Sequence, residues 1–299
     1  MASFGHQAYA LGSKTVYLKW IKTNHRDIRI VRPGDDENVR SYCEKSGLYG
    51  VNGTFYYTYM DTPPSGYKAL DVHRISMYNT NPGDRENPTA AQPVRPIGTT
   101  NVDNAGFMFC QEHTSTAIPN YIYSDRHQGT LASYKFQGQH SLDMTNIRWA
   151  VGGFGLHLDG DFGDKDTYDE ALGDEGAWSG LFGQAPRTAI FYIGGQYIGE
   201  NIVLLTVFGD SKLYDPANES ATLSARTNCG VTPSELRSII KDVFPSATTH
   251  GIMLDGGGST GIAYKNASGR LETQMVGNQI GNTGVFIPRN ANTMIVTPM

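Results

Sequence analysis

Residues 254–260, with the sequence LDGGGST, form the segment whose residue types and order most clearly suggest chemistry. A carboxylate, Asp255, stands at the end of an apolar run, and three glycines follow it. Glycines permit the tight bend that exposes backbone N–H groups, and a concave row of such groups binds anions. Ser259 and Thr260 would add hydroxyl donors. No Lys follows the last glycine, so the segment is not a P-loop, and the glycines alone are equally consistent with a simple sharp turn.

Two further polar residues stand at the ends of expected strands. Asn52 precedes a glycine in the run GVNGTFYY, and Arg187 opens the apolar run RTAIFY. Asn before Gly is most often a turn residue, and an Arg at a junction of loop and strand is most often a surface residue. Neither residue alone therefore distinguishes a functional site from a structural role.

Taken together and in this order, the segments resemble the phosphodiester glycosidase family, which includes the lysosomal enzyme that removes N-acetylglucosamine from mannose 6-phosphate tags. The resembling segments are GVNGTFYY (50–57), WAVGGFGLHLDG (149–160), APRTAIFY (185–192), IMLDGGGST (252–260) and the closing PRNANTMIVTP (288–298). The chain departs from the family pattern at Phe154, where Pro is usual, and at Phe191, where Gly is usual. These departures concern the identity of the substrate more than the reaction.

The resemblance implies a hydrolase that cleaves the glycosidic C–O bond of a sugar-1-phosphodiester and releases a sugar and a phosphate monoester. It implies three catalytic residues: Asp255 as nucleophile or base, Arg187 as a bidentate clamp on the phosphate, and Asn52 to orient a sugar hydroxyl or the attacking water. The implied substrate-binding residues are Gly256, Gly257, Gly258, Ser259, Thr260, Thr188 and Gly153. The expected partner is a small or polymer-linked sugar phosphodiester.

Elementary chemistry agrees with this division of labour. The leaving group would be a phosphate monoester, a weak base whose second pKa is about 6. Its departure needs little help from a general acid. It does need a carboxylate that supports the oxocarbenium-like transition state and fixed positive charge on the departing phosphate.

Two other classes of function stay open at this point. The chain could be a non-catalytic carbohydrate-binding module that uses some of its 17 tyrosines as sugar platforms, with the Gly-rich segment as a structural bend. It could also be a phosphodiesterase that cuts the P–O bond. That chemistry usually recruits metal ions through clustered His and Asp, and His157 with Asp159 is a single such pair with no second His motif to complete it.

The acidic stretch 159–175 is the place in the sequence that most resembles a cation site. It carries several aspartates and has calcium-like chemistry, but its glycine spacing does not fit an EF-hand loop. We therefore expect a solvated acidic loop that could hold one structural calcium ion, and we expect no other cofactor. His157 and His250 flank two of the motifs, and a hydrogen-bonded structural role is the commoner one for such residues.

The elements that must position these residues are mostly strands. Alternating and apolar runs predict strands at 50–59, 106–110, 149–158, 187–193, 202–208, 250–255, 259–264 and 294–296, and a hairpin within 15–31 that turns at 23–25. Short helices are expected at 38–45 and at 233–244, the second with Thr232 as N-cap, Pro233 at its first position and Glu235 closing a capping box. Strands that outnumber helices without regular alternation indicate an α+β fold with a mixed, mainly antiparallel sheet. We expect a single domain over residues 1–299 with a loop-rich insertion around 61–100.

Composition limits the partners. The 299 residues carry a net charge of −5, so the chain lacks the basic footprint of a nucleic-acid-binding protein. No apolar run approaches the roughly 20 residues of a membrane span. The N-terminus lacks the pattern of a signal peptide, so we expect a cytoplasmic protein, or part of a phage or another assembly, that is not classically secreted. Three widely separated cysteines predict buried free thiols rather than a disulfide framework. The sequence sets no oligomeric state.

Overall fold

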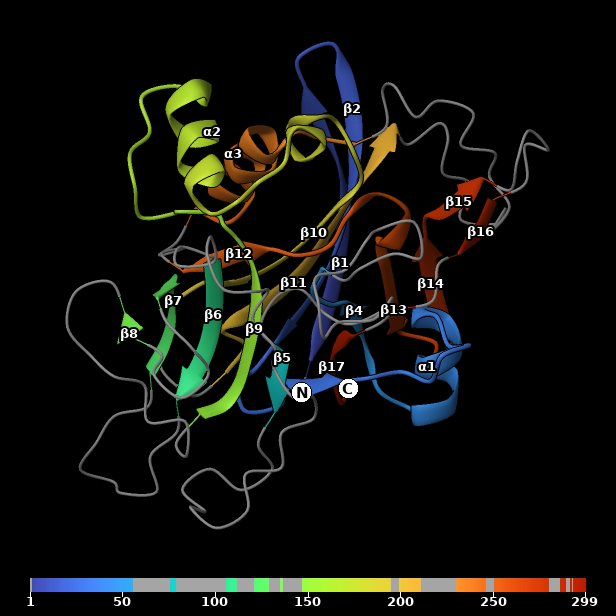
Figure 1. Cartoon of the computed structure of the whole chain (residues 1–299). Coiled ribbons are helices and arrows are strands. Elements are labelled where there is room, and N and C mark those ends of the chain that lie inside the picture. The colour runs from blue at the N-terminus through green and yellow to red at the C-terminus, as the bar shows by residue number, and fades with distance from the viewer. Residues whose placement is uncertain are drawn as a thin grey trace.

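The computed structural model describes the chain over residues 2–55, 76–78, 106–111, 121–128, 135–136, 147–194, 199–210, 230–245, 250–279, 286–288, 291 and 293–299. Two antiparallel sheets and three α-helices make up most of this part (Figure 1). The fold is therefore α+β, as predicted, and every described strand pair is antiparallel.

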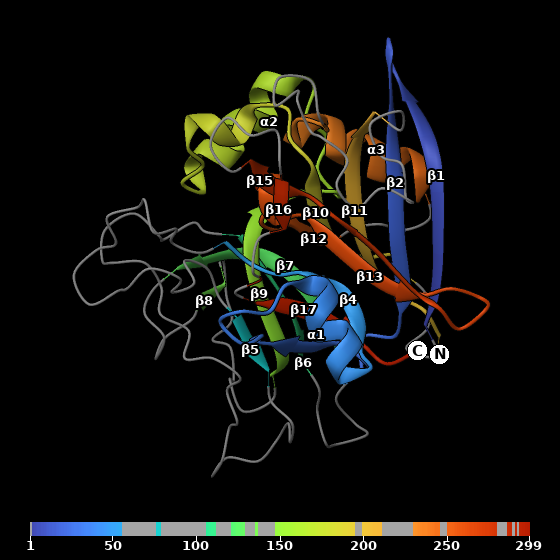
Figure 2. The ribbon, with the colours of Figure 1, turned by 90° about the vertical axis from the view of Figure 1, so that its right-hand side faces the viewer.

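The larger sheet has ten strands. In spatial order they are β1 (Ser3–Leu11), β2 (Lys14–Thr23), β11 (Ile202–Asp210), β10 (Arg187–Tyr192), β12 (Gly251–Met253), β9 (Ile147–Gly155), β6 (Gly106–Gln111), β7 (Tyr121–Gln128) and β8 (Lys135–Phe136), with β5 (Ser76–Tyr78) also paired to β9. The β1–β2 hairpin stands out along one edge of the molecule (Figure 2). Most of the sheet joins strands that are far apart in sequence.

The smaller sheet has five strands, in the order β14 (Leu271–Met275), β13 (Gly261–Lys265), β4 (Tyr49–Asn52), β17 (Met294–Thr297) and β3 (Arg29–Val31). A separate pair joins β15 (Gly277–Gln279) to β16 (Phe286–Pro288). The predicted strands that carry Asn52 and the closing apolar run thus lie side by side in this sheet.

The helices cover the outer faces of the two sheets. They are α1 (Val39–Ser46), α2 (Lys165–Asp174) and α3 (Pro233–Val243), with two short 3₁₀ turns, η2 (Ser179–Phe182) and η3 (Gly257–Ser259). The capping box of α3 forms as predicted, because the Thr232 hydroxyl accepts the Glu235 N–H while the Glu235 carboxylate accepts the Thr232 N–H. None of the described helices is long and apolar enough to cross a membrane.

Alternation along the strands builds the layers. In β10, Ile190 enters a core between the two sheets, whereas Ala189 and Phe191 enter a second core under α2 and α3. The inter-sheet core also receives Val51 and Ile295 from the smaller sheet, and α1 packs on the outer face of that sheet. The order of layers is helices, larger sheet, smaller sheet, helix (Figure 1).

The hairpin predicted within 15–31 is wrong. Its two runs do form strands, but β2 belongs to the larger sheet and β3 to the smaller one. The turn between them crosses from sheet to sheet, and the buried side chain of Asn201 holds it by accepting the His25 N–H at 2.9 Å. Ile28 and Ile30 therefore reach the inter-sheet core from the side of the smaller sheet. The hairpin partner of β2 is β1, whose strand the sequence did not predict, and β11 pairs with the other edge of β2.

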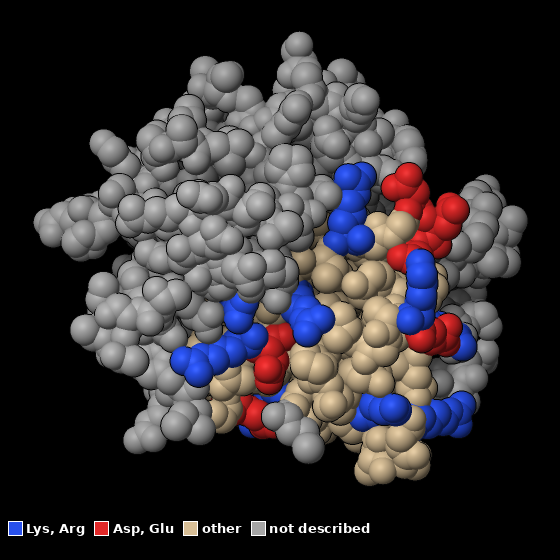
Figure 3. Space-filling model, turned by 90° about the horizontal axis from the view of Figure 1, so that it is seen from below, with Lys and Arg blue, Asp and Glu red and all other residues tan. Residues whose placement is uncertain are grey.

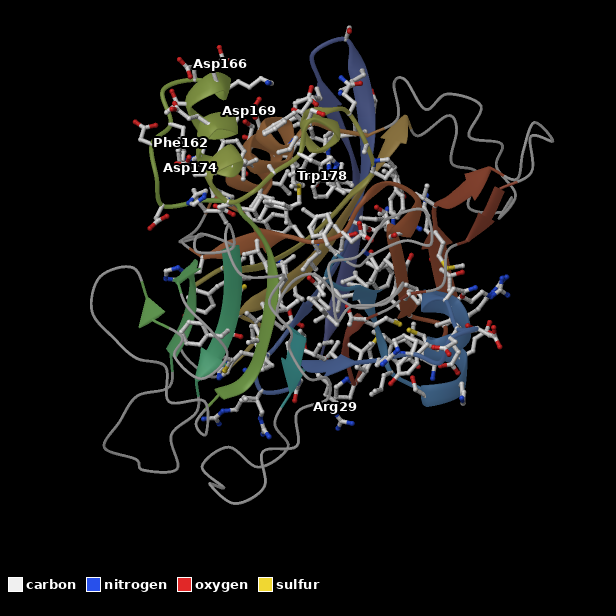
Figure 4. The ribbon with its side chains drawn as sticks, viewed as in Figure 1. Arg29, Phe162, Asp166, Asp169, Asp174 and Trp178 are labelled. Carbon is white, nitrogen blue, oxygen red and sulfur yellow. The ribbon has the colours of Figure 1, made fainter. Side chains whose placement is uncertain are left out.

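The stretch 159–175 is not a continuous acidic loop, because residues Lys165–Asp174 form α2. Asp164 caps this helix through the Thr167 N–H, and the apolar side chains of Tyr168 and Leu172 fix it to the sheet. Lys165 pairs with Asp169 one turn later. The side chains of Asp166, Asp169 and Asp174 are spread along the helix (Figure 4), and no group of three or more metal-ligating side chains occurs among the described residues. The calcium ion stays a prediction.

Several predicted features fall outside the described residues. Most of the insertion around 61–100 does so, apart from β5, and so does Cys229. On the face seen in Figure 3, Lys and Arg lie among Asp and Glu over the described surface, so this part of that face carries mixed charge.

Cys43 and Cys110 are buried free thiols, as predicted, and this has a measurable consequence. Burial raises the pKa of the Cys43 thiol to about 12, so at about pH 8 only about one thiol in 10⁴ is the reactive thiolate. We expect iodoacetamide to leave Cys43 unmodified in the native protein and to modify it in denaturing urea, as read by peptide mass spectrometry. Rapid labelling of native Cys43 would contradict its burial between α1 and the smaller sheet.

Candidate active site

Asp255 lies where the two sheets meet. The strand before it, β12, runs beside β10, and the Leu254 N–H donates to the Thr188 carbonyl at 2.8 Å. The next N–H along the chain, that of Asp255, turns to the smaller sheet and donates to the Gly53 carbonyl at 3.2 Å. The side chain of Asp255 is partly exposed, so the fold delivers one carboxylate to an accessible seam between the sheets.

Asn52 is the buried residue that joins these segments. Its Nδ2 donates to the Asp255 carbonyl at 2.7 Å. Its Oδ1 accepts two hydrogen bonds, from the Thr188 hydroxyl at 2.7 Å and from the Gly261 N–H at 3.0 Å. Both lone pairs of the amide oxygen are therefore occupied, and the side chain holds β4, β10 and both ends of the Gly-rich turn in one register.

Arg187 is buried at the start of β10 and uses most of its guanidinium on backbone carbonyls. Its Nε donates to Val231 at 3.1 Å, and its Nη2 donates to both Leu181 and Gly183 at 2.6 Å. Burial lowers the pKa of Arg187 to about 10, and the nearby Asp255 carboxylate opposes that shift. The group remains a cation at neutral pH.

The remaining nitrogen of Arg187 is directed to the turn. A methyl group placed on Gly256 would lie 3.7 Å from Nη1, and Nη1 has no hydrogen bond to a described residue. A bidentate clamp that uses two terminal nitrogens is therefore not the arrangement seen, since Nη2 already serves two carbonyls. The arrangement offers one charged donor on the side of the guanidinium that faces Asp255 and Gly256.

The Gly-rich turn uses most of its own N–H groups. Gly256 donates to the Asp255 carboxylate at 2.8 Å, Gly257 donates to the Pro186 carbonyl at 2.8 Å, and the N–H groups of Ser259 and Thr260 close η3. Gly257 needs to be glycine because its φ is 60°. Within the described part of the chain, the predicted anion nest is left with the N–H of Gly258 and the hydroxyl of Thr260.

The hydroxyl of Thr260 is an unusual feature of this turn. The side chain is fully buried, and its Oγ1 has no hydrogen-bond partner among the described residues. A buried hydroxyl without a partner costs roughly 1–3 kcal/mol.

Gly153 has a packing role that the sequence did not reveal. A methyl group at this position would lie 2.1 Å from the Met253 carbonyl oxygen, because β9 approaches β12 closely there. The described geometry therefore gives Gly153 a reason to be glycine that does not involve a substrate.

An aromatic corner beside the site was missed. Phe55, Phe154 and Trp178 lie edge to face, with ring centroids 5.2 to 5.9 Å apart. Phe55 and Phe154 are buried, whereas Trp178 is 46% exposed. The sequence carried a usable signal, because Trp178 stands in the short run GAWSGLFG, where its neighbours are small.

A second missed feature is the pair of His157 and Glu175. His157 has a φ of 45°, which is unusual for a residue other than glycine. Its Nε2 lies 2.5 Å from Glu175 Oε1, and the other oxygen of that buried carboxylate accepts the Gly155 N–H at 2.6 Å. His157 is thus hydrogen-bonded in the structure.

Burial lowers the pKa of His250, against the opposing effect of Asp159.

Comparisons with known proteins give little beyond this geometry. No protein-family model and no curated protein matches the chain. Among solved structures, the chain is similar to one described as "Crystal structure of a hypothetical protein from Synechocystis", with 13% identity and a TM-score of 0.46 over 99% of this chain. The chain spans 62% of the length of that protein. A likeness this distant carries no argument about function.

The packing role of Gly153 can be tested by adding one methyl group. We expect Gly153→Ala to destabilise the protein by about 1–3 kcal/mol, because the new Cβ cannot fit against the Met253 carbonyl. Gly163→Ala is the matched control, since a methyl group at Gly163 meets nothing within 4 Å, and it should change the free energy of unfolding by less than about 0.5 kcal/mol. Urea unfolding of both variants measures the difference. Equal stabilities would leave substrate contact as the better explanation of Gly153.

Proposed function

We propose that this protein is a phosphodiester glycosidase, a hydrolase that cleaves the C–O bond between the anomeric carbon of a sugar and a phosphodiester. The observation that carries the proposal is the pairing of a partly exposed carboxylate, Asp255, with one side of a buried and fixed guanidinium, Arg187. These are the two charges that the reaction needs, at the end of the segment that resembles the family.

The reaction balances with water as the second substrate. The bond between the anomeric carbon and the phosphate oxygen breaks, and its electron pair leaves with the phosphate monoester. A water oxygen becomes the new anomeric hydroxyl, and the second proton of that water passes to the phosphate monoester or to solvent. Asp255 supports the positive charge that develops at the sugar, either as a nucleophile or as the base that activates water. Arg187 Nη1 and the Gly258 N–H oppose the negative charge on the departing phosphate.

Asn52 acts in this scheme as a positioning residue. Because its amide oxygen is fully occupied by Thr188 and Gly261, it is better suited to fix the backbone of Asp255 than to orient a sugar hydroxyl. Thr188 acts in the same way through Asn52. The chemistry then rests on the carboxylate and the guanidinium.

A carbohydrate-binding module without catalytic activity is the second candidate. One observation favours it, which is the half-exposed indole of Trp178 beside two buried phenylalanines. A lectin would need that surface and would not need Asp255 beside Arg187.

Removing the charge of Asp255 separates the two candidates. We expect Asp255→Asn to lower turnover of the methyl phosphodiester of N-acetylglucosamine 1-phosphate by on the order of 10² to 10⁴, the usual contribution of a general base. Free sugar is measured with and without a chelator, and the urea midpoint shows that the variant is folded. Asp36→Asn, an exposed carboxylate on the loop before α1, is the control that should keep wild-type turnover. Full activity in folded Asp255→Asn would remove this residue from the mechanism.

Heavy-oxygen water identifies the bond that breaks. Cleavage at the anomeric carbon places the labelled oxygen on the released sugar, whereas cleavage at phosphorus places it on the phosphate product. We expect the label on the sugar, as read by mass spectrometry of both products. A labelled phosphate would instead identify a phosphodiesterase.

A further inference from the structure

We propose that Trp178 is the sugar platform of this site, on which one face of the substrate's pyranose ring stacks. The inference rests on the proposed function and names the part of the substrate that the chain recognises outside the reacting bond.

Two buried rings fix the indole of Trp178. Phe55 lies at a centroid distance of 5.6 Å and an interplanar angle of 88°, and Phe154 lies at 5.9 Å and 67°. Both contacts are edge to face, so neither phenylalanine covers the indole by parallel stacking. The side chain is held while 46% of it stays exposed, which is the geometry of a rigid aromatic surface ready to accept a ligand.

The backbone under Trp178 is held on both sides. Before it, the Ala177 N–H donates to the Leu172 carbonyl at the end of α2, at 3.0 Å. After it, Arg187 Nη2 holds the carbonyls of Leu181 and Gly183, each at 2.6 Å. The platform is therefore anchored by the same guanidinium that faces Asp255.

Gly180 keeps part of the indole uncovered. A methyl group at this position would lie 3.1 Å from Trp178 Nε1 and 3.2 Å from Cδ1. The φ of Gly180 is not positive, so its backbone does not require glycine. The absence of a side chain instead leaves the Nε1 side of the ring open to a ligand. The Nε1–H of Trp178 can then donate a hydrogen bond to that ligand.

Two connections link Trp178 to the surroundings of the reacting carboxylate. Phe55, which touches Trp178, follows Gly53 by two residues, and the Gly53 carbonyl accepts the Asp255 N–H at 3.2 Å. Two residues span at most about 7 Å. Arg187 provides the other connection, from the Leu181 carbonyl to the neighbourhood of Asp255. Figure 4 shows Trp178 on the segment that follows α2.

The chemistry of this corner suits a sugar. A pyranose ring has an apolar face of C–H groups and a rim of hydroxyls, so it matches a flat ring that has a polar donor at its edge. A sugar ring bound there would contact Trp178 while its anomeric phosphate reaches Arg187 and the Gly-rich turn. A nucleobase could stack on the same indole, and a comparison of uridine with the sugar phosphodiester distinguishes a nucleobase from a sugar as the occupant.

The test uses the full chain and the methyl phosphodiester of N-acetylglucosamine 1-phosphate. We expect Trp178→Ala to raise KM about tenfold with little change in kcat, because a platform binds ground state and transition state alike. Gly180→Val keeps the indole but covers it, and we expect a similar rise in KM. Trp20→Phe is the control, since Trp20 packs against Phe244 under α3, and it should leave KM unchanged.

A binding measurement that needs no turnover accompanies the kinetics. Trp149 is fully buried and Trp178 is the most exposed of the three tryptophans, so acrylamide quenching in Trp20→Phe reports chiefly on Trp178. We expect the probe to protect this fluorescence in Trp20→Phe and to lose that effect in Trp20→Phe combined with Gly180→Val.

The outcomes separate the platform from the reaction. Wild-type hydrolysis with an unchanged KM in both Trp178→Ala and Gly180→Val would overturn the platform and leave the glycosidase standing. Protection without hydrolysis would support the platform and overturn the glycosidase. Absence of both, or protection by uridine but not by the probe, would overturn a sugar as the occupant.

Discussion

The hydrogen bonds of one buried amide, that of Asn52, are the constraint on which the site depends. Asn52 ends β4 in the smaller sheet, and its partners are Thr188 in β10, the carbonyl of Asp255 after β12 and the N–H of Gly261 that opens β13. Asn52 is buried, and a buried amide that lacks hydrogen-bond partners destabilises the fold. A shift of either sheet would break several of these bonds together. The position of Asp255 is thus determined by the packing of the two sheets rather than by its own loop.

The buried charge of Arg187 is likewise held in place by hydrogen bonds to the main chain. A buried guanidinium is costly unless its donors are used, and here three of its hydrogen bonds go to main-chain carbonyls. Carbonyl partners satisfy the donors without neutralising the charge. The positive charge of Arg187 therefore remains directed at Asp255 and Gly256. The carboxylate of Asp255 in turn opposes the lowering of the Arg187 pKa by burial. A carboxylate in the same place as these carbonyls would have cancelled that charge.

The sequence correctly predicted the elements whose caps and apolar spacing lie within a few neighbouring residues. The helix after Thr232 carries its capping box, its Pro and its apolar spacing within a dozen residues, and α3 forms as expected. The apolar strands β10, β11, β12 and β17 were identified for a similar reason. The turn at 23–25 was not, because whether β2 and β3 pair with each other or join different sheets depends on Asn201 and on strands far along the chain. The first turn of α2 was hidden by its acidic composition, although Asp164 and Thr167 form its cap.

For the site, the sequence indicated which residues come together but not what each of them does there. Asp255, Arg187, Asn52 and Thr188 do converge at the seam between the sheets. The pattern of residues could not show that Asn52 and most of the Arg187 donors are already occupied, since that depends on the carbonyls of Leu181, Gly183 and Val231. Gly153 and Gly256 looked like substrate contacts, yet a side chain at either position would meet a main-chain carbonyl. A glycine in a motif can equally reflect a ligand or a neighbouring strand.

The donors and acceptors that are already occupied also indicate which surface must provide selectivity. If Asn52, Thr188 and most of Arg187 are committed to holding the backbone, few described groups at the seam remain to distinguish one sugar from another. The turn at 256–260 has used most of its N–H groups as well, and those that remain suit a phosphate. Recognition of the sugar then has to use surfaces beside the seam, and the described surface with a fixed, half-exposed aromatic ring is the corner of Trp178 and Phe55. Arg187 connects the two functions physically, because the guanidinium that faces Asp255 also holds the backbone that presents this ring.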